Sequence, residues 1–370
     1  MRHHVLLIPG FFGFEALGDM RYFVGVTEHV ERAFEEQGHE VVVSEVDTLP
    51  TASLRARASR VLDHAAALDD GPLHLVGHST GGLDARLAIA ASASLPTDAD
   101  PAAVQERVAS VVTVCTPHGG SPLASFFGGV AGQPLLRLVT ALGVLVVRRM
   151  PLPVDLLVKL GNLVRRADDL AGLDDTVLDE LYRDLLGGFD EERRAELVRL
   201  LEQIHDDTSL VFQLTPEGTD LLDAATGDPP ETRYGCVVAR APRPALRTTL
   251  AHRQDIYAQT LHVVFALLHT VVSRGRSRAT ADDAQRAALR EALGEVSDRD
   301  NDGIVPTLTQ AWGEVVGAVS ADHLDVVGHF GGGFGTDWLP AATEFGDADF
   351  ESLWTDIARF QLGACSGGTH

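Results

Sequence analysis

The feature that most constrains this chain is a short, mostly apolar stretch that runs directly into a G-x-S-x-G motif. Residues 73–76 form the stretch, and the motif extends from Gly77 to Gly81. In a tight turn between a buried strand and a helix, glycines remove side chains that would clash, and the central side chain stands above the sheet. We therefore predict a strand, a turn and a helix here, with Ser79 as a candidate nucleophile. The alternative interpretation is an ordinary glycine-rich turn.

Apolar strands and amphipathic helices alternate over most of the chain. Strand patterns occupy residues 5–8, 39–46, 73–76, 108–115, 233–239 and 315–319, and helical patterns occupy residues 27–37, 53–68, 83–91, 255–272 and 282–293. Thr27 is placed to cap the first helix, and Gly38 to end it. Such alternation is typical of a parallel sheet with helices on its faces. We predict an α/β fold with a mostly parallel central sheet flanked by helices.

One long region breaks that alternation. From residue 122 to residue 215 the strand signal is lost, and helical patterns follow at residues 135–149, 155–166, 174–186 and 190–205. We predict a core of residues 1–121 and 216–365, a large helical insertion at residues 122–215, and a disordered tail at residues 366–370. The first of these helices is apolar around most of its circumference, so it must bury against something. Whether it is a moving cover or a fixed part of the insertion stays open.

The composition excludes some classes of protein. The chain of 370 residues carries 30 basic and 53 acidic side chains, a formal net charge of −23, which argues against nucleic-acid binding. Its most apolar uncharged stretch, residues 138–147, is shorter than the roughly 20 residues that cross a bilayer, and its first residues lack a signal-peptide pattern. We expect no transmembrane segment and a soluble protein, cytoplasmic as printed or secreted if a leader was removed.

A serine nucleophile needs hydrogen-bond donors for the oxyanion that forms when it attacks a carbonyl. One donor usually comes from the residue after the nucleophile, here Thr80, and the second from a loop after an early strand. The glycine-containing loop at residues 8–14 can turn the N–H of Phe11 toward the site. In the same loop, Phe12 and Phe14 are predicted to wall an acyl pocket, and burial in the core is the alternative.

Several segments resemble, in order, the bacterial triacylglycerol lipase and esterase family of the α/β-hydrolase fold. They are residues 5–14, 38–47, 76–86, 116–124, 214–216, 301–306 and 323–325. The resemblance implies a serine hydrolase that cleaves carboxylic esters, with a lid inside the insertion. It also implies a small-molecule or lipid ester as substrate, met in solution or at a lipid–water interface. Aliphatic polyesters are larger candidate substrates.

The resemblance assigns the acid and the base. Asp302 matches the family's acid within Asn-Asp-Gly, and His323 follows the last predicted strand in a loop. The order serine, acid, histidine is the one this fold uses. An imidazole at His323 can bond Ser79 with one nitrogen and Asp302 with the other. Nearby residues offer alternative assignments, namely Asp298, Asp300, Asp325 and His329.

Four further residues are predicted to line the substrate pocket, namely His78, His118, Val305 and Leu324. His78 adjoins the nucleophile, and its alternative role is to orient or pack beside the turn. His118 belongs to a loop after a sheet strand, on the side where parallel sheets bind ligands.

We expect no metal and no other cofactor. The acidic run at residues 298–303 resembles the start of an EF-hand loop, but Thr309 stands where the loop needs a bidentate glutamate. The resemblance also implies a structural calcium in some relatives, with Asp325 at a ligand position. A second ligand position then falls on His329, which is a poor ligand for a hard cation. The three cysteines match no zinc or redox spacing.

Two other functions remain as alternatives. An acyltransferase or a thioesterase would use the same three residues with a different acceptor or substrate. A non-catalytic lipid-binding module on the same fold would be expected to have a broken triad. Here all three residue types stand in the expected order, which favours the ester hydrolase.

Overall fold

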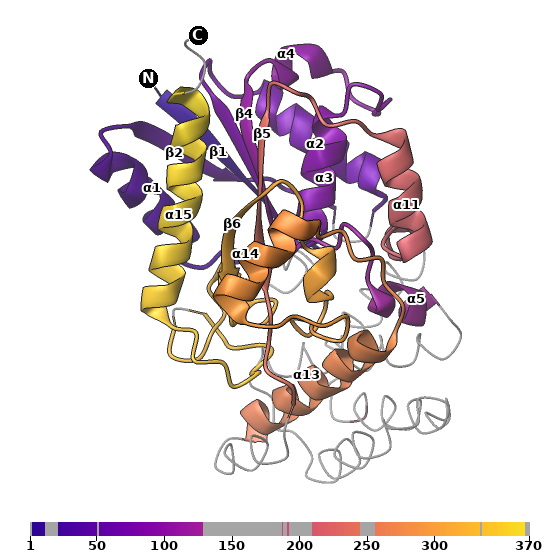
Figure 1. Ribbon diagram of the computed structural model, residues 1–370. Helices are drawn as coiled ribbons and strands as arrows, with labels where there is room; N and C mark the ends of the chain where they lie inside the picture. Colours follow the sequence, from indigo (N-terminus) through magenta and orange to yellow (C-terminus); the bar gives the residue numbers. More distant parts are fainter. Residues whose placement is uncertain are drawn as a thin grey trace.

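The computed structural model describes residues 2–11, 21–49, 52–128, 209–244, 256–333 and 335–366, together with Gly187 and Glu191. Within these residues six strands form one sheet in the order β2-β1-β3-β4-β5-β6, and every neighbouring pair is parallel. The strands are β1 (Arg2–Ile8), β2 (Glu40–Glu45), β3 (Leu73–His78), β4 (Val108–Val114), β5 (Arg233–Ala239) and β6 (Glu314–Val319). Each overlaps a predicted strand, so the predicted parallel α/β fold is confirmed (Figure 1).

The central strands are buried because their side chains alternate between two apolar cores. Val5 and Leu7 of β1 belong to one core, and Leu6 and Ile8 belong to the other. Every residue of β3 is buried. A parallel strand covered on both faces has no solvent side, which is why these segments read as nearly continuous apolar runs.

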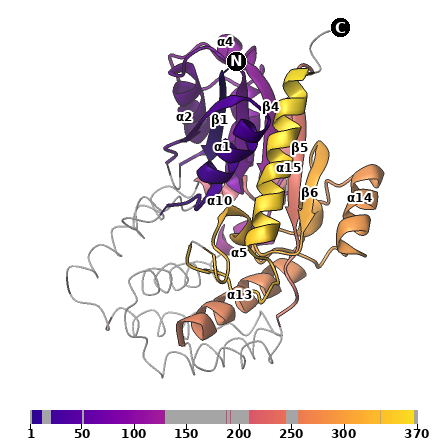
Figure 2. The same ribbon diagram turned by 90° about the vertical axis from the view of Figure 1, so that its left-hand side faces the viewer.

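Two pairs of helices cover the faces of the sheet. α1 (Val26–Glu36) packs beside α15 (Asp347–Ser366) on one face, and α2 (Leu54–Ala66) packs beside α3 (Thr80–Ile89) on the other (Figure 1). The remaining described helices are α4 (Pro101–Gln105), α5 (Pro122–Gly128), α10 (Ser209–Gln213), α11 (Pro216–Ala225), α13 (Ile256–Arg274), α14 (Asp283–Leu293) and the short 3-10 helices η3 (Thr307–Thr309) and η4 (Asp325–Val327). α13 lies with α5 at the carboxyl end of the sheet (Figures 1 and 2).

The helix starts follow local capping chemistry, with one correction. α1 begins at Val26 after Gly25, whose φ of 74° suits glycine, so the predicted cap at Thr27 is wrong. Asp282 caps α14 through a reciprocal capping box with Gln285. Thr215 caps α11, a helix that the sequence patterns did not predict. α15 was also not predicted, although Phe350, Trp354 and Ile357 line one buried face of it.

Most of the predicted insertion lies outside the described residues. All four of its predicted helices fall there apart from Glu191, and the described parts of residues 122–215 include α5 and α10. The boundaries of the insertion and its role as a lid therefore stay predictions. Ser366 ends α15, and the rest of the predicted tail also lies outside. No helix in the described part of the chain has the length and apolarity needed to cross a membrane.

Candidate active site

Ser79 stands on a strained turn between β3 and α3. Its backbone has φ 55° and ψ −127°, a conformation rare for a residue with a side chain. A Cβ atom on Gly77 would lie 2.3 Å from the carbonyl oxygen of Gly81, and one on Gly81 would lie 2.1 Å from the carbonyl oxygen of Ile8. The two glycines of the motif are therefore sterically required, and the strand, turn and helix lie as the motif predicts.

The loop after β1 passes directly against this turn. A Cβ atom on Gly10 would lie 2.6 Å from the Cβ atom of Ser79, so only glycine permits the approach. Phe11 follows, half-buried, and Thr80 is the first residue of α3, where a backbone N–H lacks an acceptor within its helix. Their role as oxyanion donors stays a prediction. Phe12 and Phe14 lie outside the described residues.

A buried ion pair that the sequence did not reveal holds this loop. Arg57 of α2 contacts Asp84 of α3 at 2.8 Å, and both side chains are fully buried. The Arg57 guanidinium also donates to the carbonyl oxygen of Pro9 at 2.7 Å, so it ties the loop to both helices. Burial raises the pKa of Asp84 to about 6, an effect that the neighbouring Arg57 opposes. Only the three-dimensional packing brings these residues together, because no local spacing links them.

The predicted acid and base are hydrogen-bonded to each other. Nδ1 of His323 lies 2.7 Å from Oδ2 of Asp302, and the backbone N–H of His323 donates to the carbonyl oxygen of Asp302 at 2.9 Å. The Asp302 side chain is fully buried, and its Oδ1 accepts the backbone N–H groups of Ile304 and Val305. Gln310 donates to Oδ2 at 3.1 Å. Four donors therefore hold this carboxylate in one orientation toward the imidazole.

The alternative acids and base make other contacts. Asp298 is exposed, and Asp300 accepts the backbone N–H of Ser297. Asp325 accepts from the backbone of Asp322 and from the hydroxyl of Thr343. His329 donates to the carbonyl oxygen of Tyr22 at 3.0 Å. The hydrogen bond to His323 thus distinguishes Asp302 from the three other aspartates.

His78 connects the serine turn to the histidine loop. Its Nε2 donates to the carbonyl oxygen of His323 at 2.8 Å, and its Nδ1 accepts the hydroxyl of Tyr22 at 2.6 Å. The rings of His78 and His323 lie 4.7 Å apart. Burial, reinforced by the neighbouring His323, holds the pKa of His78 well below its usual range. These two bonds hold His78 between Tyr22 and the loop of His323, and its predicted contact with substrate stays a prediction. The sequence did not reveal the contact with Tyr22.

Cys115 completes the interior of this cluster. It follows β4 directly, with a positive φ of 52°, and its sulfur lies within 4.8 Å of nitrogens of His78 and His323. Burial raises the pKa of the Cys115 thiol, as do the charges of Asp302 and Asp322. The neutral thiol therefore packs behind the imidazoles without adding charge.

His118 belongs to a separate polar network. Its Nδ1 accepts from Arg86 at 3.1 Å, its Nε2 donates to the hydroxyl of Thr113 at 3.1 Å, and its ring stacks on Trp312. Arg86 also pairs with Asp223 at 3.0 Å. With both ring nitrogens bonded to the protein, His118 supports the fold in this network, and its predicted substrate contact has no support in these bonds.

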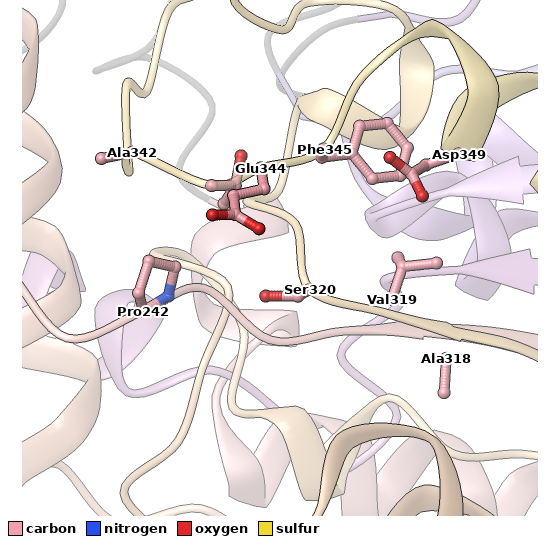
Figure 3. A pocket seen from close by; sticks show the side chains of 9 residues that line it. Pro242, Ala318, Val319, Ser320, Ala342, Glu344, Phe345 and Asp349 are labelled. Atoms are coloured by element: carbon pink, nitrogen blue, oxygen red, sulfur yellow. The ribbon is translucent and has the colours of Figure 1, made fainter.

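The other two predicted pocket residues, Val305 and Leu324, lie next to the predicted acid and base. Val305 is 1% exposed and bonds Asp302 through its backbone. Leu324 is half-buried and packs against the core that contains α1 and α15. A cavity of about 450 Å³ lies at the carboxyl ends of β5 and β6, with Pro242, Ser320 and Glu344 around it (Figure 3). Ser79, Asp302 and His323 do not line this cavity.

Three carboxylates gather next to the histidine loop. One carboxylate oxygen from each of Asp322, Asp325 and Asp337 lies within 4.8 Å of the others, and Oδ1 of Asp337 has no hydrogen-bond partner among the residues that the structure describes. Burial raises the pKa of Asp325 and of Asp337 to about 7. Oxygen donors of this kind suit a hard divalent cation. The cluster fits such a cation better than the sequence-based pairing of Asp325 with His329, because His329 is not among these ligands.

Comparisons with known proteins find that the chain is similar to bacterial lipases and esterases. No family model matches the chain. Over 132 residues it is 30% identical to a triacylglycerol lipase of Vibrio cholerae serotype O1, an alignment that covers 35% of this chain and 37% of that protein. The chain therefore spans little more than a third of the curated relative that it matches.

Solved structures resemble the chain over nearly its whole length. Staphylococcus hyicus lipase superposes with a TM-score of 0.54 at 14% identity, over 99% of this chain and 97% of the lipase. EstA from Clostridium botulinum superposes with a TM-score of 0.54 at 17% identity, over 97% of this chain and 87% of EstA. A metagenomic carboxyl esterase superposes with a TM-score of 0.51 at 16% identity, over 97% of this chain and 75% of the esterase. At this identity the likeness shows the fold, and the chain has the α/β-hydrolase fold.

Proposed function

We propose that this chain is a serine hydrolase that cleaves carboxylic esters through an acyl-enzyme on Ser79. The observation that carries the proposal is the hydrogen bond from His323 to the buried Asp302. The loop that holds His323 is bonded to His78, the residue directly before Ser79 on its strained turn. The order serine, acid, histidine along this fold supports the assignment. The names of the similar proteins, which are lipases and esterases, agree with it.

In the proposed mechanism, Nε2 of His323 takes the proton of the Ser79 hydroxyl as the oxygen attacks the ester carbonyl. Asp302 keeps the proton of the imidazole on Nδ1 and stabilises the imidazolium that forms. The backbone N–H groups of Phe11 and Thr80 hold the oxyanion. The imidazolium then protonates the departing alcohol, and in the second half His323 activates the water that releases the acid.

The proposed substrates are esters with a hydrophobic acyl part. The triacylglycerol lipase relative supports this class, and the resemblance extends it to lipid–water interfaces and to aliphatic polyesters. We propose that the predicted insertion at residues 122–215 covers the acyl site. The net charge of −23 disfavours anionic lipid surfaces, so neutral lipids fit best.

The experiment is hydrolysis of p-nitrophenyl esters, from short to long acyl chains, by the wild type and by Ser79→Ala. We expect the substitution to lower kcat by about a million-fold with the fold intact, as in other serine hydrolases. Retained turnover would exclude Ser79 as the nucleophile. A rate increase where the long esters aggregate would support a lipase that responds to interfaces, whereas turnover of short soluble esters alone would support an esterase.

The acceptor is tested in the same assay by adding primary alcohols and by supplying a thioester substrate. We expect free acid as the main product and a preference for the oxygen ester, because water is the proposed acceptor. Transfer of most of the acyl group to the alcohol would replace the hydrolase by an acyltransferase that uses the same residues.

A further inference from the structure

A second cluster of reactive side chains lies at the opposite end of the sheet from Ser79. His3 stands near the start of β1, His74 near the start of β3, and Cys365 near the end of α15. The start of β1 and the end of α15 lie at the same end of the molecule (Figure 1). Segments from the two extremes of the described chain and from β3 therefore meet at the amino edge of the sheet.

The ligand atoms of this cluster converge. Nδ1 of His3 lies 3.1 Å from Nε2 of His74, and the sulfur of Cys365 lies 4.0 Å from the first nitrogen and 3.9 Å from the second. In a tetrahedral zinc site, bond lengths of 2.0–2.3 Å place two nitrogens about 3.3 Å apart and a nitrogen and a sulfur about 3.6 Å apart. The observed triangle differs from these separations by a few tenths of an ångström, a distance that side-chain rotation can close.

The far nitrogen of each histidine already has a partner. Nδ1 of His74 lies 2.8 Å from the hydroxyl of Ser110, and Nε2 of His3 lies 3.2 Å from Nδ1 of His39. Ligating histidines usually donate their other N–H to a neighbouring acceptor, which fixes the tautomer and the ring orientation. Ser110 and His39 are placed to accept in this way.

Electrostatics keeps both imidazoles ready to bind a cation. His3 and His74 are buried, and burial lowers the pKa of His3 to about 4 and that of His74 to about 3. Both rings are therefore neutral at pH 7, as metal ligation requires. Cys365 is exposed, so an ion can enter from solvent on its side.

We propose that His3, His74 and Cys365 bind a divalent transition-metal ion of the zinc class, with solvent in the fourth position. Imidazole and thiolate ligands select such ions over calcium or magnesium. On binding, the Cys365 thiol releases one proton to solvent as its sulfur bonds the metal. One proton lies between Nδ1 of His3 and Nε2 of His74 in the metal-free protein. On metal binding the ring that carries it changes tautomer, so that the proton is on the nitrogen that does not face the metal. No oxidant or reductant is needed.

The bound ion would join β1, β3 and α15 in one coordination sphere, so its expected role is to secure the C-terminal helix against the sheet. An ion that binds the folded chain and not the unfolded chain raises the melting temperature. The site lies at the amino edge of the sheet and does not depend on the proposed esterase activity.

The test is metal binding by chelator-stripped, reduced protein. We expect one Zn²⁺ per chain by equilibrium dialysis, an increase of about 3 °C in Tm at saturating Zn²⁺, and a thiolate-to-cobalt charge-transfer band when Co²⁺ replaces zinc. Zn²⁺ should also slow the alkylation of Cys365, which is the exposed one of the three cysteines.

Three variants assign these signals. Cys365→Ser should abolish the charge-transfer band, and His74→Gln should abolish tight Zn²⁺ binding. Ser110→Ala, which removes only the outer partner, should weaken binding about 10- to 100-fold. His64→Asn is the matched control, because His64 is a half-buried histidine bonded to Ser44 outside the cluster, and it should bind zinc like the wild type.

Zinc could also bind His323. Binding is therefore measured in Ser79→Ala and in the double variant Ser79→Ala, His323→Asn. Zinc that is bound by the first and lost in the second belongs to His323 and not to the proposed site. No stoichiometric zinc in the wild type, or equal binding and an unchanged cobalt spectrum in Cys365→Ser, would overturn the proposal. Failure of the esterase assay would leave it standing.

Discussion

His323 and His118 are both buried histidines in loops at the carboxyl edge of the sheet, yet their surroundings differ. His118 has both ring nitrogens bonded to the protein, one to Arg86 and one to Thr113. His323 uses Nδ1 for the buried Asp302, and within the described part of the chain no protein group bonds its Nε2. An imidazole that exchanges protons needs one nitrogen held and the other available. The comparison therefore separates a structural histidine from a candidate base.

The charges around the two rings sharpen the difference. Burial, together with the nearby Arg86 and Arg278, holds the pKa of His118 well below its usual range, so this ring stays neutral. His323 faces a carboxylate that four donors hold in place, and such a carboxylate stabilises the imidazolium formed during proton transfer. Both histidines lie in loops next to the sheet, and they differ in that His323 contacts a buried carboxylate whereas His118 contacts an arginine.

The largest expected effect compares the two histidines directly. His323→Asn should lower kcat for a p-nitrophenyl ester by about a million-fold, because the serine then has no base. His118→Asn should leave kcat within about tenfold and instead lower the free energy of unfolding by about 1–3 kcal/mol, since it breaks a buried hydrogen-bond network. Steady-state kinetics and denaturant titration of both variants measure the two effects. Equal losses of kcat in two folded variants would remove the distinction.

The next effect compares two aspartates in one loop. Asp302→Asn should reduce kcat by about 10⁴, because an amide no longer fixes the correct tautomer of His323. Asp300→Asn is the control, since its carboxylate bonds only a backbone N–H and Arg243 outside the cluster. We expect it to change kcat by less than about tenfold. The reverse ranking would move the acid from Asp302 to Asp300.

A smaller effect tests the bridge from the serine turn to the histidine loop. Tyr22→Phe removes the hydroxyl that bonds Nδ1 of His78, while His78 still bonds the carbonyl oxygen of His323. The loss of this buried donor should lower kcat about tenfold with little change in KM, because it loosens His323 and not the substrate. A change confined to unfolding, with kcat intact, would mean that Tyr22 serves the fold alone.

The smallest effect concerns the acidic cluster beside the histidine loop. Folding raises the pKa of Asp325 and Asp337 to about 7, so the folded chain binds protons more tightly than the unfolded chain. Stability from this source is present at low pH and is lost as the pH rises from about 4 through about 7. We expect Tm in EDTA to fall between about pH 5 and about pH 8 by a few degrees, and to fall less in Asp337→Asn than in the exposed control Asp298→Asn.

Calcium extends the same measurement. A divalent cation neutralises the cluster once its carboxylates ionise, so Ca²⁺ should raise Tm more at pH 8 than at pH 5. An identical pH dependence in Asp337→Asn and the wild type would contradict the raised pKa values.

The strands of the sheet were predictable because each of them carries a local apolar pattern. Residues 73–81 carry both the buried strand and the turn, and the clashes that a side chain would make at Gly77 and Gly81 explain why the motif needs glycine. Asp302 was identified by its match to a known family and not by its local pattern, since Asp298 and Asp300 stand in the same loop. Its four donors appear only when the loop is folded.

Other parts of the site could not be predicted because they join distant segments. Arg57 contacts Asp84 and Pro9, and Tyr22 contacts His78, although no sequence spacing between these residues predicts a contact. Asp337 reaches Asp322 and Asp325 in the same way. His78 and His118 are predicted pocket residues because a histidine near a motif suggests chemistry. Their bonds to Tyr22, Arg86 and Thr113 join distant parts of the chain or depend on the folded loop, so the sequence could not show them.

The most direct test of the central claim is covalent labelling with an alkyl phosphonate ester, followed by peptide mass mapping. The account predicts one phosphonyl group per chain, located on Ser79, and no labelling in His323→Asn under the same conditions, whereas His118→Asn should label like the wild type. Labelling of a different residue, or equal labelling of the His323 variant and the wild type, would contradict it.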